Sequence, residues 1–425
     1  MSAEPFTPHA EARAPKAFPA LTPVAVAIDQ LRASADPVPT ESVALMQAAG
    51  RVLAEEIVAP INVPPHDNSA MDGYVLRVVD AQRSVEQAAV LPVSQRIPAG
   101  HLGAPLASGT AARIFTGAPI PDGGELVVPQ ELTEASDAGI RLLQPMGAGQ
   151  HIRCAGEDIA QGSVLVPAGT RLSAAHLGLI ASVGQGRVTV RRRLRVAVFS
   201  TGDELRMPGE PLGPGQIYNS NRFVHTALLA QMGHEVTDLG IVRDSLDATR
   251  AALREAAQQH DIIITCGGVS VGEEDHVKAA VQAEGELTLW SLAIKPGKPL
   301  AHGKVRRADG SSAQFIGLPG NPVSSFVTLL IVVAPLFKAM LGETAREQAL
   351  DLRADFAWPK PDKRQEFLRV RMNAAGGLDL YPNQGSGVLT SCAWADGLVD
   401  NPGGRAIAEG DTVRFLPLSG LMGLA

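Results

Sequence analysis

The chain is poor in cysteine, in excess positive charge and in long apolar runs. Its three cysteines, Cys154, Cys266 and Cys392, are far apart and odd in number, which predicts neither a disulfide framework nor a cysteine-based metal site. The net charge of −7 argues against a dedicated nucleic-acid or membrane-surface protein. The most apolar run, residues 326–337, is shorter than the ~20 residues of a membrane span and contains Pro335. We therefore expect a cytoplasmic protein with no nucleic-acid or membrane partner.

The composition is that of a globular protein with several domains. Hydrophobic residues make up 45% of the 425 residues and charged residues 19%, which provides ample material for a core. A chain of this length predicts about three or four domains. Residues 1–23 are rich in Ala, Pro and Glu and contain no apolar segment, so we expect a disordered tail there rather than a signal peptide.

Apolar runs alternate with helical patterns between residues 191 and 345. This alternation is typical of an α/β domain, in which helices cover a parallel sheet. The expected strands are 195–200, 235–242, 261–265, 288–294 and 314–318. The expected helices are 221–232, 246–259, 274–283 and 322–340. In such sheets ligands bind where the strands end.

The remaining segments predict one linker domain and two β-rich domains. Residues 63–149 contain short strands separated by Gly and Pro, which indicates a small inserted β domain. The flanking segments, 24–62 and 150–190, have helical patterns and would form a discontinuous linker domain, with helices at 24–35, 41–50 and 173–183. Residues 346–425 return to short strands, which predicts a C-terminal β-barrel domain.

Glycine-rich and lysine-rich loops follow the expected strands of the α/β domain. One apolar run ends in a loop whose Gly267, Gly268 and Gly272 expose backbone N–H groups that suit a phosphate. Lys295 and Lys298 lie in the proline-framed sequence KPGKP, where they supply point charges for an oxyanion. These loops predict a phosphate-bearing or oxyanionic ligand.

Carboxylates occur in four separate loops, at Asp67, Asp158, Glu204 and Asp275. Acidic side chains repel an anionic ligand unless a metal ion intervenes, so they favour binding of a divalent cation and polarisation of a phosphoryl group. Thr116, in a loop at a strand end, could position a substrate or a water molecule. For the loop that contains Asp67, a turn stabilised by its own Asx side chains is the alternative.

A series of motifs runs through the chain in a fixed order: PPHDNSAMDGYV from Pro64, RIFTGAPIPDG from Arg113, RCAGEDIAQG from Arg153, FSTGDEL from Phe199, GQIYNSN from Gly215, ITCGGVSVGEEDHVK from Ile264, AIKPGKPL from Ala293, GLPGNPVSSF from Gly317 and YPNQGSGVLTSCAWADGL from Tyr381. The set closely resembles the bacterial molybdopterin molybdenumtransferases, the MoeA family. It is also similar to the E domains of gephyrin and of the plant molybdenum-insertion protein. The resemblance covers the chain from about residue 23 to its end.

The resemblance implies an enzyme of molybdenum cofactor biosynthesis. Such an enzyme takes adenylyl-molybdopterin and molybdate, releases AMP, and uses a divalent metal, usually Mg²⁺. The implied catalytic residues are Asp67, Thr116, Asp158, Glu204 and Asp275, and the metal ligands among them are Asp67, Glu204 and Asp275. The implied substrate-binding residues are Gly267, Gly268, Ser270, Gly272, Lys295, Lys298, Pro319, Asn321, Ser324, Arg364, Arg369 and Ser386. Which of the two arginines completes the anion cage stays open.

The resemblance also implies an elongated homodimer. Asp67 and Thr116 belong to the inserted domain and Lys295 to the α/β domain, so we expect them to meet in a cleft between subunits rather than within one. The expected protein partners are the molybdopterin adenylyltransferase and the recipient molybdoenzymes or their chaperones.

Two alternatives stay open. Molybdopterin adenylyltransferase resembles residues 191–345 alone, and it would consume ATP rather than release AMP. A scaffold, such as the gephyrin-like relatives that anchor membrane receptors, would need no chemistry, but this chain has no long linker and no fused second enzyme domain.

Overall fold

The computed structural model describes residues 21–267, 276–344 and 348–423. These residues form two compact units. Unit 1 comprises the described parts of Met1–Pro39 and Arg191–Ala425, and unit 2 is Thr40–Val190. The finer boundaries expected from the sequence, 24–62 with 150–190, 63–149, 191–345 and 346–425, remain a prediction.

A six-stranded sheet forms the centre of the α/β part of unit 1, with strand order β16-β13-β17-β21-β20-β18. The first four strands are parallel, and β20 and β18 are antiparallel additions at one edge. The strands are β13 (Arg195–Ser200), β16 (Glu235–Ile241), β17 (Ile262–Cys266), β18 (Gly285–Ser291), β20 (Pro299–Arg306) and β21 (Ser312–Leu318). The expected parallel sheet is therefore mixed at this edge.

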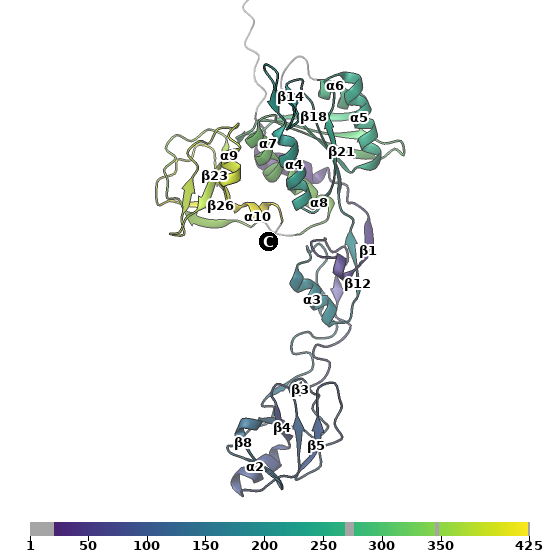
Figure 1. Ribbon diagram of the computed structural model, residues 1–425, viewed down its shortest axis with the longest axis vertical. Coiled ribbons are helices and arrows are strands. Elements are labelled where there is room, and N and C mark those ends of the chain that lie inside the picture. The colour runs from purple at the N-terminus through teal and green to yellow at the C-terminus, as the bar shows by residue number, and fades with distance from the viewer. Residues whose placement is uncertain (1–20, 268–275, 345–347, 424–425) are drawn as a thin grey trace, which may run out of the picture. The chain divides into compact units, whose positions relative to one another are not determined.

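Helices cover both faces of this sheet (Figure 1). The helices α5 (Leu246–Gln259) and α6 (His276–Glu284) pack on one face, and α4 (Ser220–Gln231) and α7 (Pro322–Thr328) lie on the other. The β-branched run at the start of β17 is completely buried, as expected for a strand with helices on both sides. The core on the α5 and α6 side consists of residues such as Phe199, Leu253, Ile263, Val281 and Phe315.

The most apolar helical segment is a core helix of unit 1. It runs without a break through α7, the π-helical turn η3 (Leu329–Val333) and α8 (Ala334–Met340). Its length and composition would allow it to cross a membrane, but 83% of its most apolar window is buried inside the protein. The π turn precedes Pro335, which has no N–H to donate and whose ring crowds the preceding turn.

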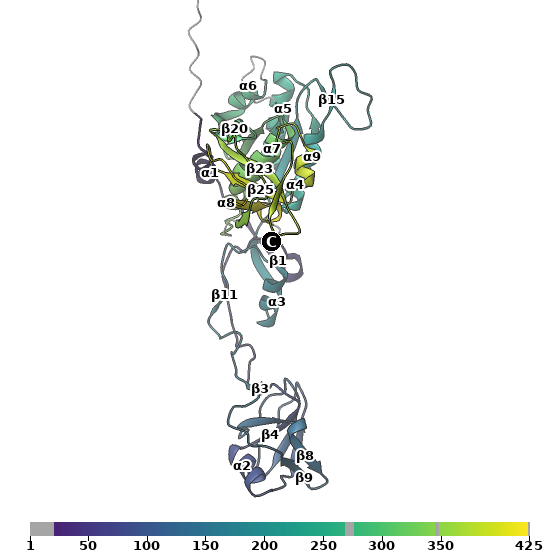
Figure 2. The same cartoon turned by 90° about the vertical axis from the view of Figure 1, so that its left-hand side faces the viewer.

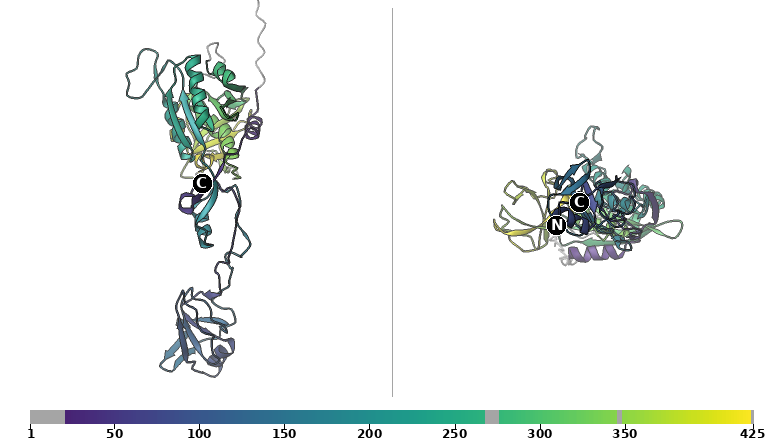
Figure 3. Two further views of the ribbon diagram at one scale, coloured as in Figure 1. Left: turned by 90° about the vertical axis from the view of Figure 1, so that its right-hand side faces the viewer. Right: turned by 90° about the horizontal axis from the view of Figure 1, so that it is seen from below.

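The helix α1 (Val24–Ala33) belongs to unit 1 (Figures 2 and 3). It buries Val24, Ala27 and Leu31 and packs against α8. The described residues up to Pro39 belong to unit 1, and unit 2 begins at Thr40. The linker domain expected from residues 24–62 and 150–190 remains a prediction. The loop between β14 (Leu205–Arg206) and β15 (Ile217–Tyr218) projects from the α/β body (Figures 2 and 3).

A second sheet of unit 1 is built mainly from the C-terminal residues, with order β19-β23-β25-β26-β22 and with β24 also paired to β23. An isolated bridge between Ala354 and Leu378 joins β22 to β24, so the strands close into a small barrel. Its core contains Leu368, Val399 and Phe415. The elements are β19 (Ile294–Lys295), β22 (Leu350–Arg353), β23 (Gln365–Met372), β24 (Leu378–Leu380), α9 (Thr390–Trp394), β25 (Gly397–Asn401), β26 (Thr412–Pro417) and α10 (Leu418–Leu421).

Unit 2 contains a four-stranded sheet with order β5-β6-β4-β7. Its residues alternate between two cores, so that Val75 and Val127 pack on one face and Leu76 and Val128 on the other. The elements are β4 (Gly73–Leu76), α2 (Val78–Glu86), β5 (Val93–Ile97), β6 (Ala111–Ile114), β7 (Leu126–Pro129), η2 (Gln130–Leu132), β8 (Thr133–Ser136) and β9 (Gly139–Leu142). The helix α2 has no counterpart in the β-rich pattern expected from the sequence.

The rest of unit 2 consists of short strand pairs and one helix. The elements are β1 (Thr40–Ala44), η1 (Leu45–Gln47), β2 (Ile57–Val58), β3 (Asn68–Ser69), β10 (Ile152–Arg153), β11 (Val164–Val166), α3 (Ala174–Ser182) and β12 (Arg187–Arg191). The helix expected at 173–183 is confirmed, and Ser173 caps it together with His176. The helix expected at 41–50 is wrong, because residues 40–44 pair with β12 as a strand.

Candidate functional site

The loop between β19 and β20 carries both predicted lysines. The short strand β19 pairs with β23 of the barrel, with Lys295 opposite Glu366, so the loop is attached to the C-terminal residues. Gly297 has a φ of +109°, and a Cβ atom there would lie 3.1 Å from the Thr328 hydroxyl of the core helix. A residue with a side chain would therefore be strained and crowded at this position. The loop lies tightly on the core helix and presents its lysines at the surface.

A cavity of about 570 Å³ lies beside this loop. Such a volume is within the usual range for small-molecule sites. Eight of the predicted substrate-binding residues line it, from five separate segments of unit 1: Gly267, Lys295, Lys298, Pro319, Asn321, Ser324, Arg364 and Ser386. Ser324 stands in the first turn of α7, and the backbone N–H of the preceding residue, Val323, donates to the Ser386 carbonyl at 3.0 Å. The structure thus brings together loops that are far apart in the sequence.

Three cations and two carboxylates set the charge of this cavity. The Lys295 ammonium lies 3.1 Å from Glu366 Oε1 and 3.6 Å from Asp362 Oδ2. Arg364 pairs with Asp362 through two N–H groups at 3.0 and 2.9 Å and also donates to the Gly297 carbonyl at 3.5 Å. The Arg364 guanidinium holds the pKa of Asp362 well below its usual range. Lys298 adds a third cationic group to the lining, and such a group of cations suits an oxyanion.

Arg369 does not line the cavity, in contrast to Arg364. It is 1% exposed, and its guanidinium donates to Ser391 Oγ at 3.1 Å and to the Phe367 carbonyl at 3.0 Å. Burial lowers the pKa of Arg369 to about 10. A further bond to the Gly385 carbonyl, at 3.4 Å, fixes the loop that presents Ser386. Arg369 thus does not face the cavity but stabilises the loop of Gly385 and Ser386 that lines it.

Polar side chains without partners gather where β13 and β17 end, at the carboxyl edge of the parallel strands. Ser200 Oγ, Thr265 Oγ1, Asn219 Nδ2 and Asn221 Oδ1 are buried and form no hydrogen bond within the described chain. Buried polar atoms normally have partners, so such a cluster indicates a place where a ligand or ordered water supplies them. Asn221 also donates to the carbonyl of Gly320, which lines the cavity, at 2.7 Å.

Glu204 lies in the loop that follows β13. Its carboxylate folds against Gly202, whose φ of +144° favours glycine at that position. Asp244, which follows β16 and was not among the predicted residues, accepts from Thr201 Oγ1 at 3.2 Å. Asp244 could have been found from the sequence, because it is a carboxylate that comes just after an expected parallel strand.

Three buried groups bind the elements behind the cavity to each other. His225 of α4 lies 3.0 Å from Cys266 Sγ and 2.8 Å from Ser325 Oγ of α7. Burial lowers the pKa of His225 to about 4 and raises that of the Cys266 thiol to about 12, so both are neutral near pH 7. The neighbours Gly267 and Ser324 line the cavity, and the neutral cluster holds them in place.

In unit 2, the loops that carry Asp67, Thr116 and Asp158 lie side by side. The strand β3 pairs with β10, which aligns residues 63–69 with residues 152–159. Asp67 Oδ1 accepts from the backbone N–H of Ala155 at 2.8 Å. The Asp158 backbone N–H donates to the carbonyl of residue 63 at 3.0 Å, which leaves its exposed carboxylate available to solvent.

Thr116 is fixed by a carboxylate that was not predicted as a site residue. Asp72 Oδ1 accepts from both the backbone N–H and the hydroxyl of Thr116, each at 2.8 Å. These two bonds lower the pKa of Asp72. The hydroxyl of Thr116 is therefore oriented by Asp72, with its oxygen lone pairs left to accept from a ligand or water.

Four predicted residues lie outside the described chain: Gly268, Ser270, Gly272 and Asp275. Within residues 21–267, 276–344 and 348–423, no group of three His, Cys, Asp or Glu side chains could hold a metal ion. Mg²⁺ is commonly held by one or two carboxylates together with substrate phosphates. The exposed Glu204 fits that requirement in unit 1, and Asp67 fits it in unit 2.

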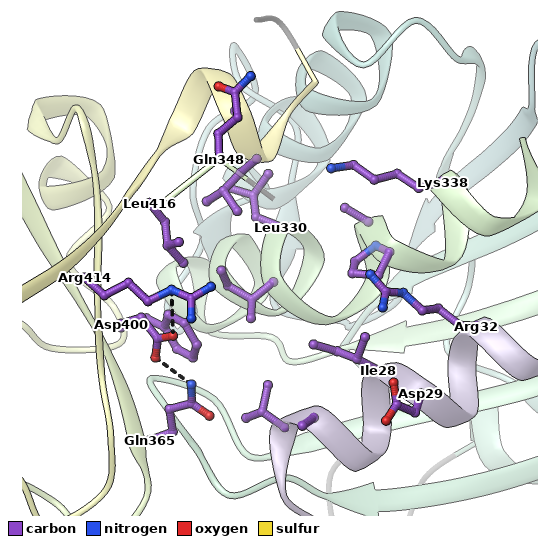
Figure 4. A pocket seen from close by; sticks show the side chains of 18 residues that line it. Ile28, Asp29, Arg32, Leu330, Lys338, Gln348, Gln365, Asp400, Arg414 and Leu416 are labelled. Carbon is purple, nitrogen blue, oxygen red and sulfur yellow. Dashed lines mark hydrogen bonds and ion pairs between the residues drawn. The ribbon is translucent and has the colours of Figure 1, made fainter. Parts of the chain in front are cut away.

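A second cavity of unit 1, of about 330 Å³, is lined by α1, the core helix and the barrel strands (Figure 4). Arg32 and Lys338 lie on one side of it and Asp400 and Arg414 on the other. The Asp400 carboxylate accepts a hydrogen bond from Gln365 and forms an ion pair with Arg414. None of the predicted site residues that the structure describes lines this cavity.

Comparison with known proteins finds relatives over most of the chain. Three family models match: the MoeA N-terminal region (domain I and II) over residues 22–184, a probable molybdopterin binding domain over 197–339, and the MoeA C-terminal region (domain IV) over 351–418. A molybdopterin molybdenumtransferase from Haemophilus influenzae is 44% identical over 309 residues, which are 72% of this chain and 74% of that protein. One from Nostoc sp. is 36% identical over 389 residues, 89% of each chain.

Solved structures are similar over nearly the same length. The crystal structure of a molybdopterin biosynthesis MoeA protein from Pyrococcus horikoshii has a TM-score of 0.78 and 30% sequence identity, and it covers 94% of this chain and 99% of that one. A second structure with this description has a TM-score of 0.80 at 26% identity. These similarities confirm the multidomain α/β and β architecture expected from the sequence.

Proposed function

The chain belongs to the MoeA family of molybdopterin molybdenumtransferases, which act in molybdenum cofactor biosynthesis, and we propose that the cavity beside the KPGK loop binds molybdate. The molybdate is inserted into adenylyl-molybdopterin, and AMP is released. The observation that supports this proposal is the convergence of Lys295, Lys298 and Arg364 with the hydroxyl groups of Ser324 and Ser386 around one cavity.

The charge and shape of the cavity suit a tetrahedral dianion. Lysine ammonium groups provide compact charge without demanding a planar ligand, and serine hydroxyls donate to the remaining oxygens. Arg364 keeps a bidentate bond to Asp362, so its role toward the ligand is to supply charge and to hold the loop carbonyls. We therefore assign the anion cage to Arg364, and the support of its wall to Arg369.

The second substrate is expected at the carboxyl edge of the parallel strands. The unpartnered groups of Asn219, Asn221 and Thr265 provide donors and acceptors there, and Gly267 directly follows β17. A phosphoryl group is cleaved chiefly through positioning and charge neutralisation. These residues would bind and orient the nucleotide, and the lysines of the neighbouring cavity would stabilise negative charge that develops on the leaving phosphate.

A divalent cation, such as Mg²⁺, would neutralise phosphate charge and polarise the phosphoryl group when bound. Glu204 in unit 1 and Asp67 in unit 2 are the described carboxylates that would hold it, together with substrate oxygens. Asp158 and Thr116 complete the proposed catalytic set, in which Thr116 positions a water molecule or substrate through the hydroxyl that Asp72 orients.

We propose that the protein acts as a cytoplasmic homodimer. Catalytic residues of unit 2 from one copy and cavity residues of unit 1 from the other would then serve one substrate. The molybdopterin adenylyltransferase and the recipient molybdoenzymes or their chaperones are the proposed partners for delivery and transfer.

The function is tested by incubating the protein with adenylyl-molybdopterin, Mg²⁺ and molybdate while AMP is followed by chromatography. The proposal predicts that AMP release requires molybdate and that molybdenum becomes bound to the pterin. An adenylyltransferase would instead consume ATP with molybdopterin. ATP consumption in the absence of molybdate-dependent AMP release would refute the proposed reaction.

A further inference from the structure

Glu366 is a completely buried carboxylate next to the proposed molybdate cavity. It lies on β23, has an exposed fraction of 0%, and faces Lys295 across the β19–β23 pairing. A buried carboxylate is costly unless it is paired and hydrogen-bonded, so its surroundings must hold it in one geometry. The reaction proposed above does not otherwise use this residue.

Both oxygens of Glu366 have partners. Oε2 accepts from the Trp358 indole N–H at 2.8 Å and from Asn401 Nδ2 at 3.5 Å, while Oε1 accepts from the Lys295 ammonium at 3.1 Å. Asn401 also donates to the Arg405 carbonyl at 2.9 Å, which fixes its orientation. Oε2 is thus anchored inside the barrel, and Oε1 is aimed at the lysine of the cavity.

Lys295 is restrained from several sides but still faces the cavity. Its side chain is 37% exposed, and its ammonium lies 5.9 Å from the centre of the Trp358 ring. An ammonium has three donors, and the contact with Glu366 uses one of them. The other two can donate to a ligand in the cavity, while Asp362 forms an ion pair with the ammonium at 3.6 Å.

We propose that Glu366 is a positioning residue that fixes the Lys295 ammonium for binding of the oxyanion. This inference rests on the proposed function of the cavity. A lysine side chain has a flexible four-carbon stem, and ordering it on ligand binding costs affinity. Glu366, anchored through Trp358, orders it before the ligand arrives. The barrel thereby contributes to molybdate affinity through a residue that does not itself contact the ligand.

The test is a double-mutant cycle on molybdate binding, measured by isothermal titration calorimetry on the full chain. The variants are Glu366→Gln, Lys295→Met and the double variant. Glutamine keeps the size of the side chain and an acceptor for Trp358. Asp400→Asn, on the neighbouring strand β25, is the matched control because Asp400 lines the other cavity. Thermal unfolding of each variant checks the fold.

Glu366→Gln is expected to weaken molybdate binding roughly 5- to 30-fold, the range that the rotamer entropy of one lysine supports, because the loss of an ordered Lys295 outweighs the repulsion that is removed with the carboxylate charge. Asp400→Asn is expected to bind as the wild type does. In the Lys295→Met background, Glu366→Gln should have no further effect on the Kd, because the group that it positions is gone. A purely structural role would lower the unfolding temperature and change the Kd equally in both backgrounds, which would overturn the inference.

Trp358→Phe keeps the inference testable if Glu366→Gln does not fold. It removes the indole donor to Oε2, so it should weaken molybdate binding in the same direction, again with no further effect beside Lys295→Met. Wild-type affinity in a folded Glu366→Gln or Trp358→Phe variant would overturn the inference alone. Wild-type affinity in Lys295→Met, or no binding by the wild type, would overturn the proposed cavity function and the inference with it.

Discussion

Replacement of Lys298 by alanine is expected to weaken molybdate use without harm to the fold. Lys298 is exposed at the edge of the cavity in the loop before β20, and its side chain contributes nothing to a buried core. Removing one charge-assisted contact costs ~1.5–3 kcal/mol. At about 1.4 kcal/mol for each factor of ten, this corresponds to a rise of about 10- to 150-fold in the dissociation constant for molybdate.

The matched control is Lys304→Ala. Lys304 lies on β20, the strand that follows the loop of Lys298; it pairs with Asp36 at 3.0 Å and does not line the cavity. The assay is the rate of AMP release from adenylyl-molybdopterin as a function of molybdate concentration. Lys298→Ala should require more molybdate for half-maximal rate, and Lys304→Ala should behave as the wild type does. If Lys298→Ala keeps the wild-type dependence on molybdate, the assignment of this cavity is refuted.

Three further predictions concern pH, the two arginines and the dimer. The folded pKa of His225, about 4, lies below its ordinary value near 6.5, so its contribution to stability is fully present above pH ~6.5 and is lost as the pH falls. From pH 7 to pH 5 the unfolding free energy of the wild type, measured by urea titration, should fall by ~2 kcal/mol. The His225→Gln variant should not show this loss. Arg369→Met should lower the unfolding free energy by ~1–3 kcal/mol, because it leaves buried acceptors unpaired. Arg364→Met should chiefly weaken molybdate binding. A larger loss of molybdate affinity in Arg369→Met than in Arg364→Met, measured by calorimetry, would contradict the assignment. Asp67→Ala and Lys295→Ala homodimers that are mixed and allowed to exchange subunits should regain roughly a quarter of the wild-type rate. Half of the dimers are then heterodimers, and each heterodimer has one intact cleft. No recovery of activity, with subunit exchange verified by mass spectrometry, would exclude a shared cleft.

Elements of both units could be predicted from the sequence where their local signals agree with the tertiary structure. The run at the start of β17, the Ser173 cap of α3 and the unbroken helix from residue 322 to residue 340 all follow from period and capping. The prediction of a helix at 41–50 was wrong: the apolar residues of this segment fit a helix, but pairing with β12 makes its first part a strand. Pairing with a neighbouring strand can thus override the secondary structure that the local apolar pattern predicts.

The candidate site could be predicted only in its residue types. The KPGK loop and the strand-end glycines indicated anion binding, and Gly267, Lys295 and Lys298 of these loops line one cavity. The other five predicted residues that line it were implied by the family resemblance. Glu366 was not predicted, because nothing local distinguishes it and its contact with Lys295 spans 71 residues. The choice between Arg364 and Arg369 likewise depends on burial, which the sequence of one strand does not encode. The partner of Asp67 at Ala155 is 88 residues away, so no local pattern reveals it.

X-ray diffraction recorded at the molybdenum absorption edge can show whether molybdate binds beside the KPGK loop. Crystals of the protein soaked with molybdate should show an anomalous peak within contact distance of Lys295, Lys298 and Ser386. A variant crystal of Lys298→Ala, soaked at the same concentration, should show a weaker peak at that position. A peak only in the second cavity, between Arg32 and Arg414, or no peak in unit 1, would contradict the account.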